Sequence, residues 1–303
     1  MLDECEALRL EATRSRVTGV VCNWRGEQVC LRGEVIVLAS GALGSPGLLL
    51  ASASSLWPSG LANESGLVGR NLMRHFSDLY AIFPVGVDGD SDNRFKEIAF
   101  NDFYYIRGNK LGNVQSFGRL PPAAMLADSL QKRLSEGRAA WAGTMIRAMK
   151  PVANALLRRL VDNAWVLASV VEDPPYADNR VSVVAQPHRQ SGATLAINYT
   201  IRPYDLARIK ALRTLMRDLL SAYRFILIKQ AENNQMLAHA CGTCRFGLDP
   251  RVSVLDRNNR AHAVENLYVV DSSFFPSSAG TNPALTIAAN ALRVAATMHA
   301  NGP

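Results

Sequence analysis

Two short runs near the N-terminus, in which most positions are apolar, have the length and residue types of strands. These runs are Arg16–Cys22 and Gln28–Arg32, and Asn23–Gly26 between them contains turn-forming residues. These runs predict a β-hairpin. The next run, Glu34–Ala39, is apolar almost throughout and predicts a strand that is buried on both faces.

The predicted buried strand leads into a glycine turn and an apolar helix. The turn is Ser40–Pro46, and the apolar stretch Leu48–Ala53 follows it. Proline suits the first turn of a helix, because its φ is already helical and the N–H that it lacks would be unpaired there. The pattern therefore predicts a strand, a glycine turn and a helix that begins at Pro46.

Between about residues 78 and 235 helical and strand-like stretches alternate. Short strands with helices on one side predict an α+β layer, which suits a substrate domain. Beyond it, residues 265–271 predict a strand, and residues 282–298 predict a helix rich in Ala and Leu. In the middle region we expect helices at 123–134, 139–150 and 205–222, and strands at 164–171, 180–185 and 193–200.

Both ends of the chain have the character of a nucleotide-type domain. We expect residues 1–76 and 237–303 to form two parts of one such domain, with residues 77–236 inserted between them as a substrate domain.

Composition and charge exclude several classes of protein. The formal net charge is +7, but the basic residues are scattered and never form a run of five, so we expect no nucleic acid as a partner. No apolar run approaches the roughly 18–20 residues of a membrane span. The five cysteines are an odd number and follow no secretory leader, so we expect a reducing, cytoplasmic location without a disulfide framework.

One of the five histidines lies among residues that suggest chemistry. His239 precedes Gly242 and Thr243, a turn that could aim its side chain. Oxidation of an alcohol by hydride transfer requires a base for the hydroxyl proton. A neutral imidazole, with an ordinary pKa near 6.5, suits that task near neutral pH.

The last predicted helix opens with Asn282 and Pro283. Asparagine is a favoured N-cap and proline a favoured first helical residue, so capping alone explains both. A functional interpretation adds to this one, because a helix N-terminus carries partial positive charge and stabilises an anion placed there.

Two motifs that suggest a cofactor or a metal have simpler interpretations. Gly41, Gly44 and Gly47 have G-x-x-G-x-x-G spacing rather than that of a dinucleotide loop, and they suit a tight turn. Cys241 and Cys244 form a C-x-x-C, but zinc needs four ligands and a redox thiol needs a lowered pKa. We interpret both cysteines as small apolar residues beside a turn, and we expect no metal site.

Taken together, three segments resemble the glucose-methanol-choline (GMC) flavin oxidoreductases. Gly41–Leu50 is similar to the second sequence motif of that family, and Gly66–His75 to the segment that follows. Residues 239–286 resemble its C-terminal end. The resemblance implies FAD as cofactor, a small-molecule alcohol as substrate and hydride transfer from a CH–OH group to the flavin. It makes His239 the general base and Asn282 the residue that orients the substrate oxygen, whereas we interpret His75 as structural.

The same resemblance implies which residues lie beside the flavin. Asp271 and Ser272 correspond to positions near its ribityl–phosphate chain. The full set of expected cofactor-binding residues is Gly41, Ala42, Ser45, Pro46, Asp271, Ser272, Asn282, Pro283 and Thr286.

The resemblance lacks one part of the family pattern. Family members begin with a strand, G-x-G-x-x-G and a helix that bind the ADP half of FAD, and this sequence has no such segment. We therefore expect the C-terminal two-thirds of a GMC oxidoreductase: an incomplete FAD-binding α/β domain of Rossmann-like, GMC type with an inserted α+β substrate domain. A truncated gene, a misplaced start codon or a split protein would each explain this, the last with a separate N-terminal chain as partner.

Two other interpretations stay open. One is an inactive fragment or interaction module without catalysis, and the other is a thiol redox or metal protein that uses Cys241 and Cys244.

Overall fold

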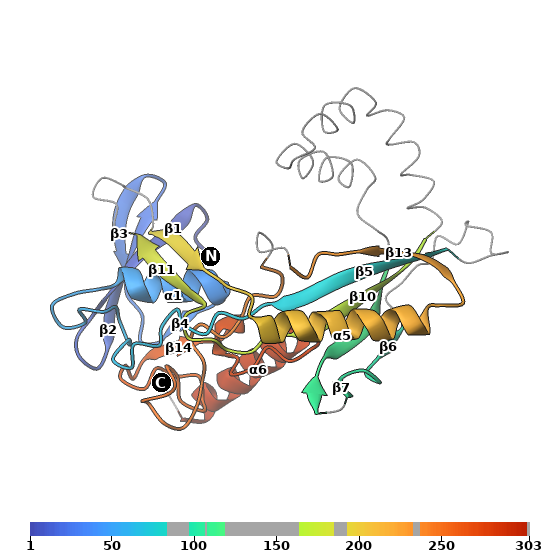
Figure 1. The fold of residues 1–303 in the computed structure, drawn as a ribbon. Coiled ribbons are helices and arrows are strands. Elements are labelled where there is room, and N and C mark those ends of the chain that lie inside the picture. Colours follow the sequence, from blue (N-terminus) through green and yellow to red (C-terminus); the bar gives the residue numbers. More distant parts are fainter. Residues whose placement is uncertain (84–96, 107, 119–163, 185–192, 233–236, 302–303) are drawn as a thin grey trace, which may run out of the picture. The chain divides into compact units, whose positions relative to one another are not determined.

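The chain divides into two compact units, each with its own packing (Figure 1). Unit 1 comprises Met1–His75, Glu172–Asp205 and Asn233–Pro303, and unit 2 comprises Phe76–Val171 and Leu206–Glu232. The division into a nucleotide-type domain, 1–76 and 237–303, and a substrate domain, 77–236, concerns function and stays a prediction. The computed structural model describes residues 1–83, 97–106, 108–118, 164–184, 193–232 and 237–301.

Unit 1 combines short sheets with two helices. Its elements are β1 (Cys5–Ala12), β2 (Val17–Trp24), β3 (Glu27–Leu31), β4 (Ile36–Leu38), α1 (Gly41–Ala51), β11 (Arg180–Val184), β12 (Thr194–Asn198), β14 (Leu267–Val269), the 3₁₀ turn η1 (Ser272–Phe274) and α6 (Ala284–Asn301).

The N-terminal sheet is an antiparallel meander in the order β1-β2-β3. The predicted hairpin is confirmed as β2 and β3, with Trp24 paired to Glu27. Arg25 and Gly26 form its two-residue turn, and both have positive φ, as a turn that matches the twist of the strands requires. Strand β1, which the sequence analysis did not predict, pairs with β2 along its whole length.

Strand β4 is shorter and less buried than predicted. It runs parallel to β14, with Ile36 opposite Leu267 and Leu38 opposite Val269. Leu38 is buried, but Val37 is 46% exposed, because successive side chains of a strand point to opposite faces. The expectation of burial on both faces is therefore wrong for the described structure.

Helix α1 begins at Gly41 and not at the predicted Pro46, which lies inside the helix. Pro46 has no N–H, so the carbonyl of Ala42, four residues earlier, lacks its usual helical donor. The Thr243 hydroxyl donates to that carbonyl over 2.8 Å. This side-chain bond compensates for the missing one and lets the helix start a turn earlier.

Strands β11 and β12 pair antiparallel and lie in unit 1. The strands predicted at 164–171 and 180–185 are present as β10 (Trp165–Glu172) and β11, and they belong to different sheets. Pro174 and Pro175 lie between them and favour an extended connection.

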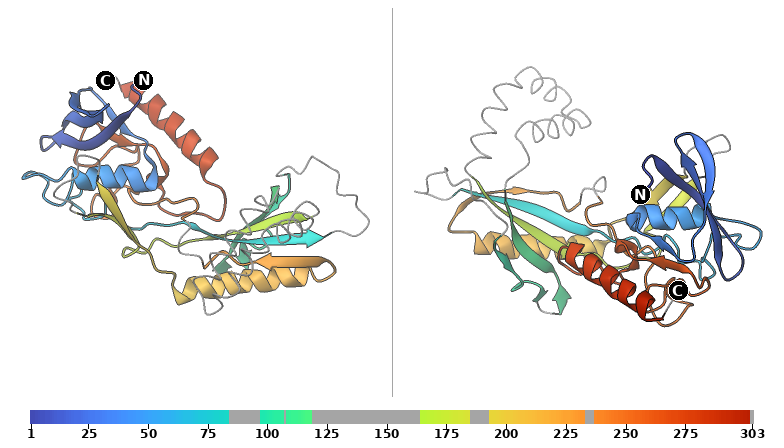
Figure 2. Two further views of the ribbon diagram at one scale, coloured as in Figure 1. Left: turned by 90° about the horizontal axis from the view of Figure 1, so that it is seen from above. Right: turned by 180° about the vertical axis from the view of Figure 1, so that it is seen from behind.

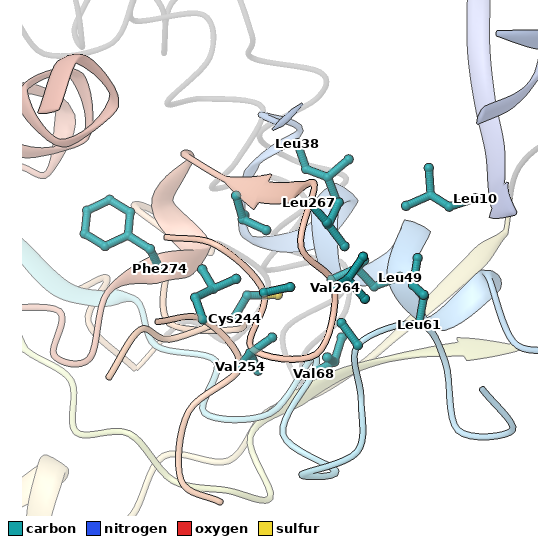
Figure 3. Close-up of a cluster of buried hydrophobic side chains, with 14 of the residues drawn as sticks. Leu10, Leu38, Leu49, Leu61, Val68, Cys244, Val254, Val264, Leu267 and Phe274 are labelled. Carbon is teal, nitrogen blue, oxygen red and sulfur yellow. The ribbon is translucent and has the colours of Figure 1, made fainter. Parts of the chain in front are cut away.

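The core of unit 1 joins the two ends of the chain (Figure 3). Leu10, Leu38 and Leu49 come from the N-terminal segment, and Val264 and Leu267 from the C-terminal one. Residues more than 200 positions apart thus bury their apolar surface together, which is the main favourable contribution to their association.

Unit 2 is built on a five-stranded sheet in the order β13-β5-β10-β9-β6. The described pairings β13–β5, β10–β9 and β9–β6 are antiparallel. The predicted helices 123–134 and 139–150 lie outside the described residues. The elements not yet given are β5 (His75–Phe83), β6 (Ala99–Phe100), β7 (Tyr105–Ile106), β8 (Asn109–Lys110), β9 (Gly112–Gly118), α5 (Pro203–Leu219) and β13 (Arg224–Ile228).

Helix α5 confirms the predicted helix over 205–222 to within three residues at its ends. Ile209, Leu212 and Met216 are buried at the spacing of one helical face. Arg213 is also buried. Its guanidinium donates two hydrogen bonds to Asp78, at 2.6 and 3.0 Å, and two to Glu232, at 2.5 and 2.7 Å.

Helix α6 begins two residues later than the predicted start at residue 282, and the carbonyl of Pro283 accepts its first helical bond from Ile287. Figure 2 draws this helix in red, next to the C-terminus. Its Leu285 and Leu292 are 86% and 73% exposed, and their seven-residue spacing places them on one face of the helix. Among the described residues, no helix is both long and apolar enough to cross a membrane.

We predict that Arg213→Met destabilises the chain by about 3–5 kcal/mol, because it leaves the buried Asp78 carboxylate without its cation. Equilibrium denaturation monitored by circular dichroism measures the change. Arg9→Ala, which removes an exposed pair with Glu11, is the control and should change stability little. A loss below about 1 kcal/mol for Arg213→Met would contradict the inferred role of the cluster.

Candidate functional site

Backbone hydrogen bonds place His239 beside His75, within unit 1. Met73 and Cys241 exchange N–H···O bonds of 3.0 and 2.9 Å, which start an antiparallel pairing of the two segments. In a regular ladder the next bond from His75 N–H would reach the carbonyl of His239. It reaches the carbonyl of Ala238 instead, at 3.1 Å, so the pairing is irregular at His239.

The irregularity coincides with an unusual backbone conformation. His239 has φ +59°, in the left-handed region that few residues other than glycine adopt. Such a conformation persists only where the surroundings enforce it, and it is common at functional sites. The side chain of His239 is exposed. The exposed imidazole of His239 is therefore carried by a backbone conformation that is energetically unfavourable for a residue other than glycine.

Gly242 makes the adjoining turn. Its φ is +90°, and a Cβ there would lie 2.6 Å from the carbonyl oxygen of Asn71 and 2.4 Å from Cε of Met73. Only glycine satisfies both conditions without a shift of its neighbours. Thr243 is anchored to Ala42, as described above.

The two histidine rings contact each other directly. The Nδ1 atoms of His75 and His239 are 2.9 Å apart, and the rings meet edge to face with centroids 5.0 Å apart. His75 Nε2 lies 3.0 Å from the carbonyl oxygen of Ser278. Burial lowers the pKa of His75, and the nearby His239 lowers it further.

A buried polar cluster lies behind His75. The Ser278 hydroxyl accepts a hydrogen bond from the backbone N–H of Asp173 and donates one to its carbonyl. The Asp173 carboxylate accepts from the Tyr199 hydroxyl at 2.5 Å and from the backbone N–H of Arg74 at 2.9 Å. Burial raises the pKa of Asp173 to about 7, although these two hydrogen bonds act against the rise.

Asp271 joins part of the predicted cofactor-binding set. Its carboxylate accepts hydrogen bonds from Gly41 N–H at 3.0 Å and from the Ser45 hydroxyl at 2.5 Å. It also accepts from the N–H and hydroxyl of Ser273, at 2.9 and 2.5 Å. These residues therefore meet around an internal carboxylate at the N-terminus of α1, and their role towards a cofactor stays a prediction.

The remaining predicted residues lie on two elements. Ala42 and Pro46 are buried within α1, and the carbonyl of the buried Ser272 accepts from Gly242 N–H at 3.2 Å. Asn282 is partly buried, Pro283 is buried and Thr286 is exposed, in order along the start of α6.

The start of α6 fits the flavin end of FAD better than the start of α1 does. The first turn of α6 contains no acidic side chain, and Ala284, Leu285 and Thr286 are exposed there. Its partial positive charge suits an anionic ring edge. The corresponding end of α1 is already bonded to Asp271.

Cys241 and Cys244 are both buried in the core. Burial raises the pKa of each thiol, which disfavours the thiolate that metal binding or disulfide exchange requires. The structure thus gives no support to the thiol interpretation.

Sequence reasoning missed His75, Asp173 and Tyr199 as members of this site. Their positions follow from the pairing of Met73 with Cys241 and from the return of the chain through Ser278. No local motif signals these contacts, since the residues come from separate segments.

Comparison with known proteins relates both ends of the chain to one family. Two family models, both described as GMC oxidoreductase, match residues 1–77 and 175–291. The chain is 31% identical to 6'''-hydroxyparomomycin C oxidase of Streptomyces lividus, covering 95% of this chain and 49% of that protein. It is 32% identical to paromamine 6'-oxidase of Streptomyces fradiae, covering 95% and 50%.

A solved structure shows the same fold. Pyridoxine 4-oxidase from Mesorbium loti has a TM-score of 0.59 and 21% sequence identity, covering 99% of this chain and 58% of that one. This chain spans about half the length of the curated relatives it matches.

We predict that Gly242→Ala destabilises the chain more than Gly26→Ala. Both glycines have φ +90°, but a Cβ at Gly26 meets nothing within 4 Å, so the control measures the backbone strain alone. The clash with Asn71 should make the Gly242 variant less stable by more than about 1 kcal/mol beyond the control. Equal losses in chemical denaturation would show that the turn adjusts freely.

The raised pKa of Asp173 predicts a pH-dependent stability. Since its folded pKa, about 7, exceeds the unfolded value near 3.8, its contribution is complete below pH 4 and is lost as the pH rises towards 7. The loss amounts to at most about 4 kcal/mol. Asp173→Asn should remove this fall in the free energy of unfolding, measured at pH 4.5 and 7.

The matched control for that experiment is Asp178→Asn. Asp178 is exposed, and its pKa is lowered by its hydrogen bond from Arg202. The fall between pH 4.5 and 7 should persist in this variant. If the fall also persists in Asp173→Asn, another group causes it.

Proposed function

This chain belongs to the GMC oxidoreductase family, whose cofactor is FAD, and we propose that it carries the catalytic part of an enzyme that oxidises an alcohol. The observation that carries the proposal is the exposed His239 imidazole, which is held in a left-handed backbone conformation by a glycine turn and hydrogen-bonded to a second, buried histidine.

His239 acts in this proposal as the general base. Its exposed ring can approach a substrate hydroxyl and take the proton as the O–H bond breaks, while a new N–H bond forms on the ring. Its contact with His75 keeps the orientation of the ring constant during this step. FAD, when bound, supplies the acceptor for the hydride that leaves the same carbon.

Asn282 has the role of orienting the substrate oxygen. Its side-chain amide can donate a hydrogen bond without competing for the proton, because an amide has no basic nitrogen near neutral pH. Its position two residues before the start of α6 also favours negative charge on nearby groups. Both effects stabilise the developing alkoxide during proton removal.

The substrates of two bacterial relatives guide the choice of substrate for this chain. One is an oxidase of 6'''-hydroxyparomomycin C and the other oxidises paromamine at its 6' position. We therefore propose the hydroxyl group of an aminoglycoside or a similar sugar alcohol as the first substrate class to test.

Exposed apolar surface supports the proposal that the ADP half of the site comes from sequence outside this chain. Leu285 and Leu292 lie on one open face of α6, and Val37 is exposed on β4 of the two-stranded parallel sheet. Exposed apolar side chains that share one face of an element often mark a surface that other protein covers. A longer form of this polypeptide or a separate N-terminal chain would supply the cover.

The proposed function can be tested by the visible absorption of the flavin. The purified chain is mixed with FAD, freed of excess and scanned, and is then mixed anaerobically with paromamine. Bleaching of retained flavin absorbance would show alcohol oxidation. If the chain is colourless, the segment of paromamine 6'-oxidase that precedes the matched region is fused to it and the experiment is repeated.

We predict that His239→Gln slows the bleaching about 10²–10⁴-fold, the usual contribution of a general base, without loss of bound flavin. The matched control is His262→Gln, whose ring is hydrogen-bonded to Ser253 elsewhere in unit 1. An unchanged rate for the His239 variant would remove this residue from the mechanism. A flavin-loaded protein that no alcohol reduces would favour the inactive interaction module.

A further inference from the structure

The partners of His75 determine where its proton lies. His75 Nε2 lies 3.0 Å from the carbonyl oxygen of Ser278. A carbonyl oxygen can only accept a hydrogen bond, so this nitrogen carries a proton. The Ser278 carbonyl is itself fixed, because the Ser278 hydroxyl is bonded in both directions to the backbone of Asp173.

The surroundings of His75 favour the neutral ring. Its side chain is buried, and burial lowers its pKa, as does the neighbouring His239. The carbonyl of Ser278 and the charge of Glu172 oppose this effect but do not outweigh it. A neutral imidazole that is protonated on Nε2 has a bare Nδ1, which can only accept.

The contact between the two rings then leaves one arrangement of protons on their Nδ1 atoms. The bare Nδ1 of His75 lies 2.9 Å from Nδ1 of His239, and two unprotonated nitrogens would repel each other at that distance. His239 Nδ1 must therefore carry a proton and donate it to His75. A neutral His239 with this proton has its lone pair on Nε2.

We propose that His75 is a positioning residue, which holds His239 in the tautomer whose Nε2 has the lone pair that accepts the substrate proton. This inference rests on the proposed role of His239 as the base. The hydrogen bond also restrains rotation of an otherwise exposed ring. A partner of this kind selects both the tautomer and the orientation of a functional histidine.

The same geometry makes His75 a fixed acceptor rather than a proton relay. When Nε2 of His239 takes the hydroxyl proton, the resulting imidazolium still donates through Nδ1 to His75. Transfer of that second proton would charge a buried ring, and the penalty of burial outweighs the favourable effects of the Ser278 and Ala279 backbone and of the Glu172 charge. The proton therefore stays on His239 until it leaves through the exposed side.

The tautomer of His239 tests the proposal without cofactor or substrate. Long-range ¹H–¹⁵N spectra of the ¹⁵N-histidine-labelled chain at pH 8 distinguish protonated from bare ring nitrogens, and His239→Gln assigns the signals. We expect Nδ1 of His239 to be protonated and Nε2 to be bare in the unsubstituted chain. The opposite tautomer would overturn the proposal.

Two substitutions of His75 sharpen this test. His75→Phe removes the acceptor, so His239 should shift towards the Nε2-protonated form that free imidazole side chains favour. His75→Asn keeps an acceptor oxygen near the position of Nδ1 and should preserve the Nδ1-protonated form. Equal spectra for both variants would overturn the proposal, and if the Phe variant does not fold, the unsubstituted chain alone still decides.

Kinetics separate this proposal from the proposed function. In the flavin-loaded enzyme we expect His75→Phe to lower kcat about ten- to a hundredfold with little change in KM, and His75→Asn to restore most of it. An Nδ1-protonated His239 in a chain that oxidises no alcohol would refute the function while supporting the pairing. An Nε2-protonated His239 would refute the pairing whatever the activity.

Discussion

The reciprocal backbone bonds between Met73 and Cys241 are the contact on which the site depends. They join the end of the N-terminal segment to the start of the C-terminal one, which lies 168 positions later in the sequence. Without this pairing, His239 would have neither its irregular backbone nor its contact with His75. The apolar core that both ends share supplies most of the free energy, and these bonds supply the register.

Polar groups inside unit 1 form two separate systems. Asp271 gathers Gly41, Ser45 and Ser273 and stabilises the first turn of α1. Asp173 and Ser278 support His75 from behind. The first system consists of hydrogen bonds within unit 1, whereas the second ends in the exposed imidazole of His239. This difference explains why the chemistry is assigned to His239 rather than to the glycine turn.

Local patterns predicted those features whose cause is local. The β2–β3 hairpin follows from two short, mainly apolar runs and the turn residues between them, and α5 follows from helical spacing. The predicted start of α1 is wrong. The hydrogen bond that compensates for Pro46 comes from Thr243, which lies 197 positions after the proline, so no local pattern indicates it. The sequence motif singled out His239. Its partner His75 could be identified only from the structure, in which Met73 and Cys241 pair the two segments.

The bond between Thr243 and the Ala42 carbonyl has a consequence for the dynamics of unit 1. It replaces a missing helical bond in α1 and at the same time anchors the residue next to Gly242. The loop that carries His239 therefore cannot open without unpairing the Ala42 carbonyl in the first turn of α1. Helix and loop are thus linked into one cooperative unit of local unfolding, and the orientation of the imidazole is as stable as the secondary structure that supports it.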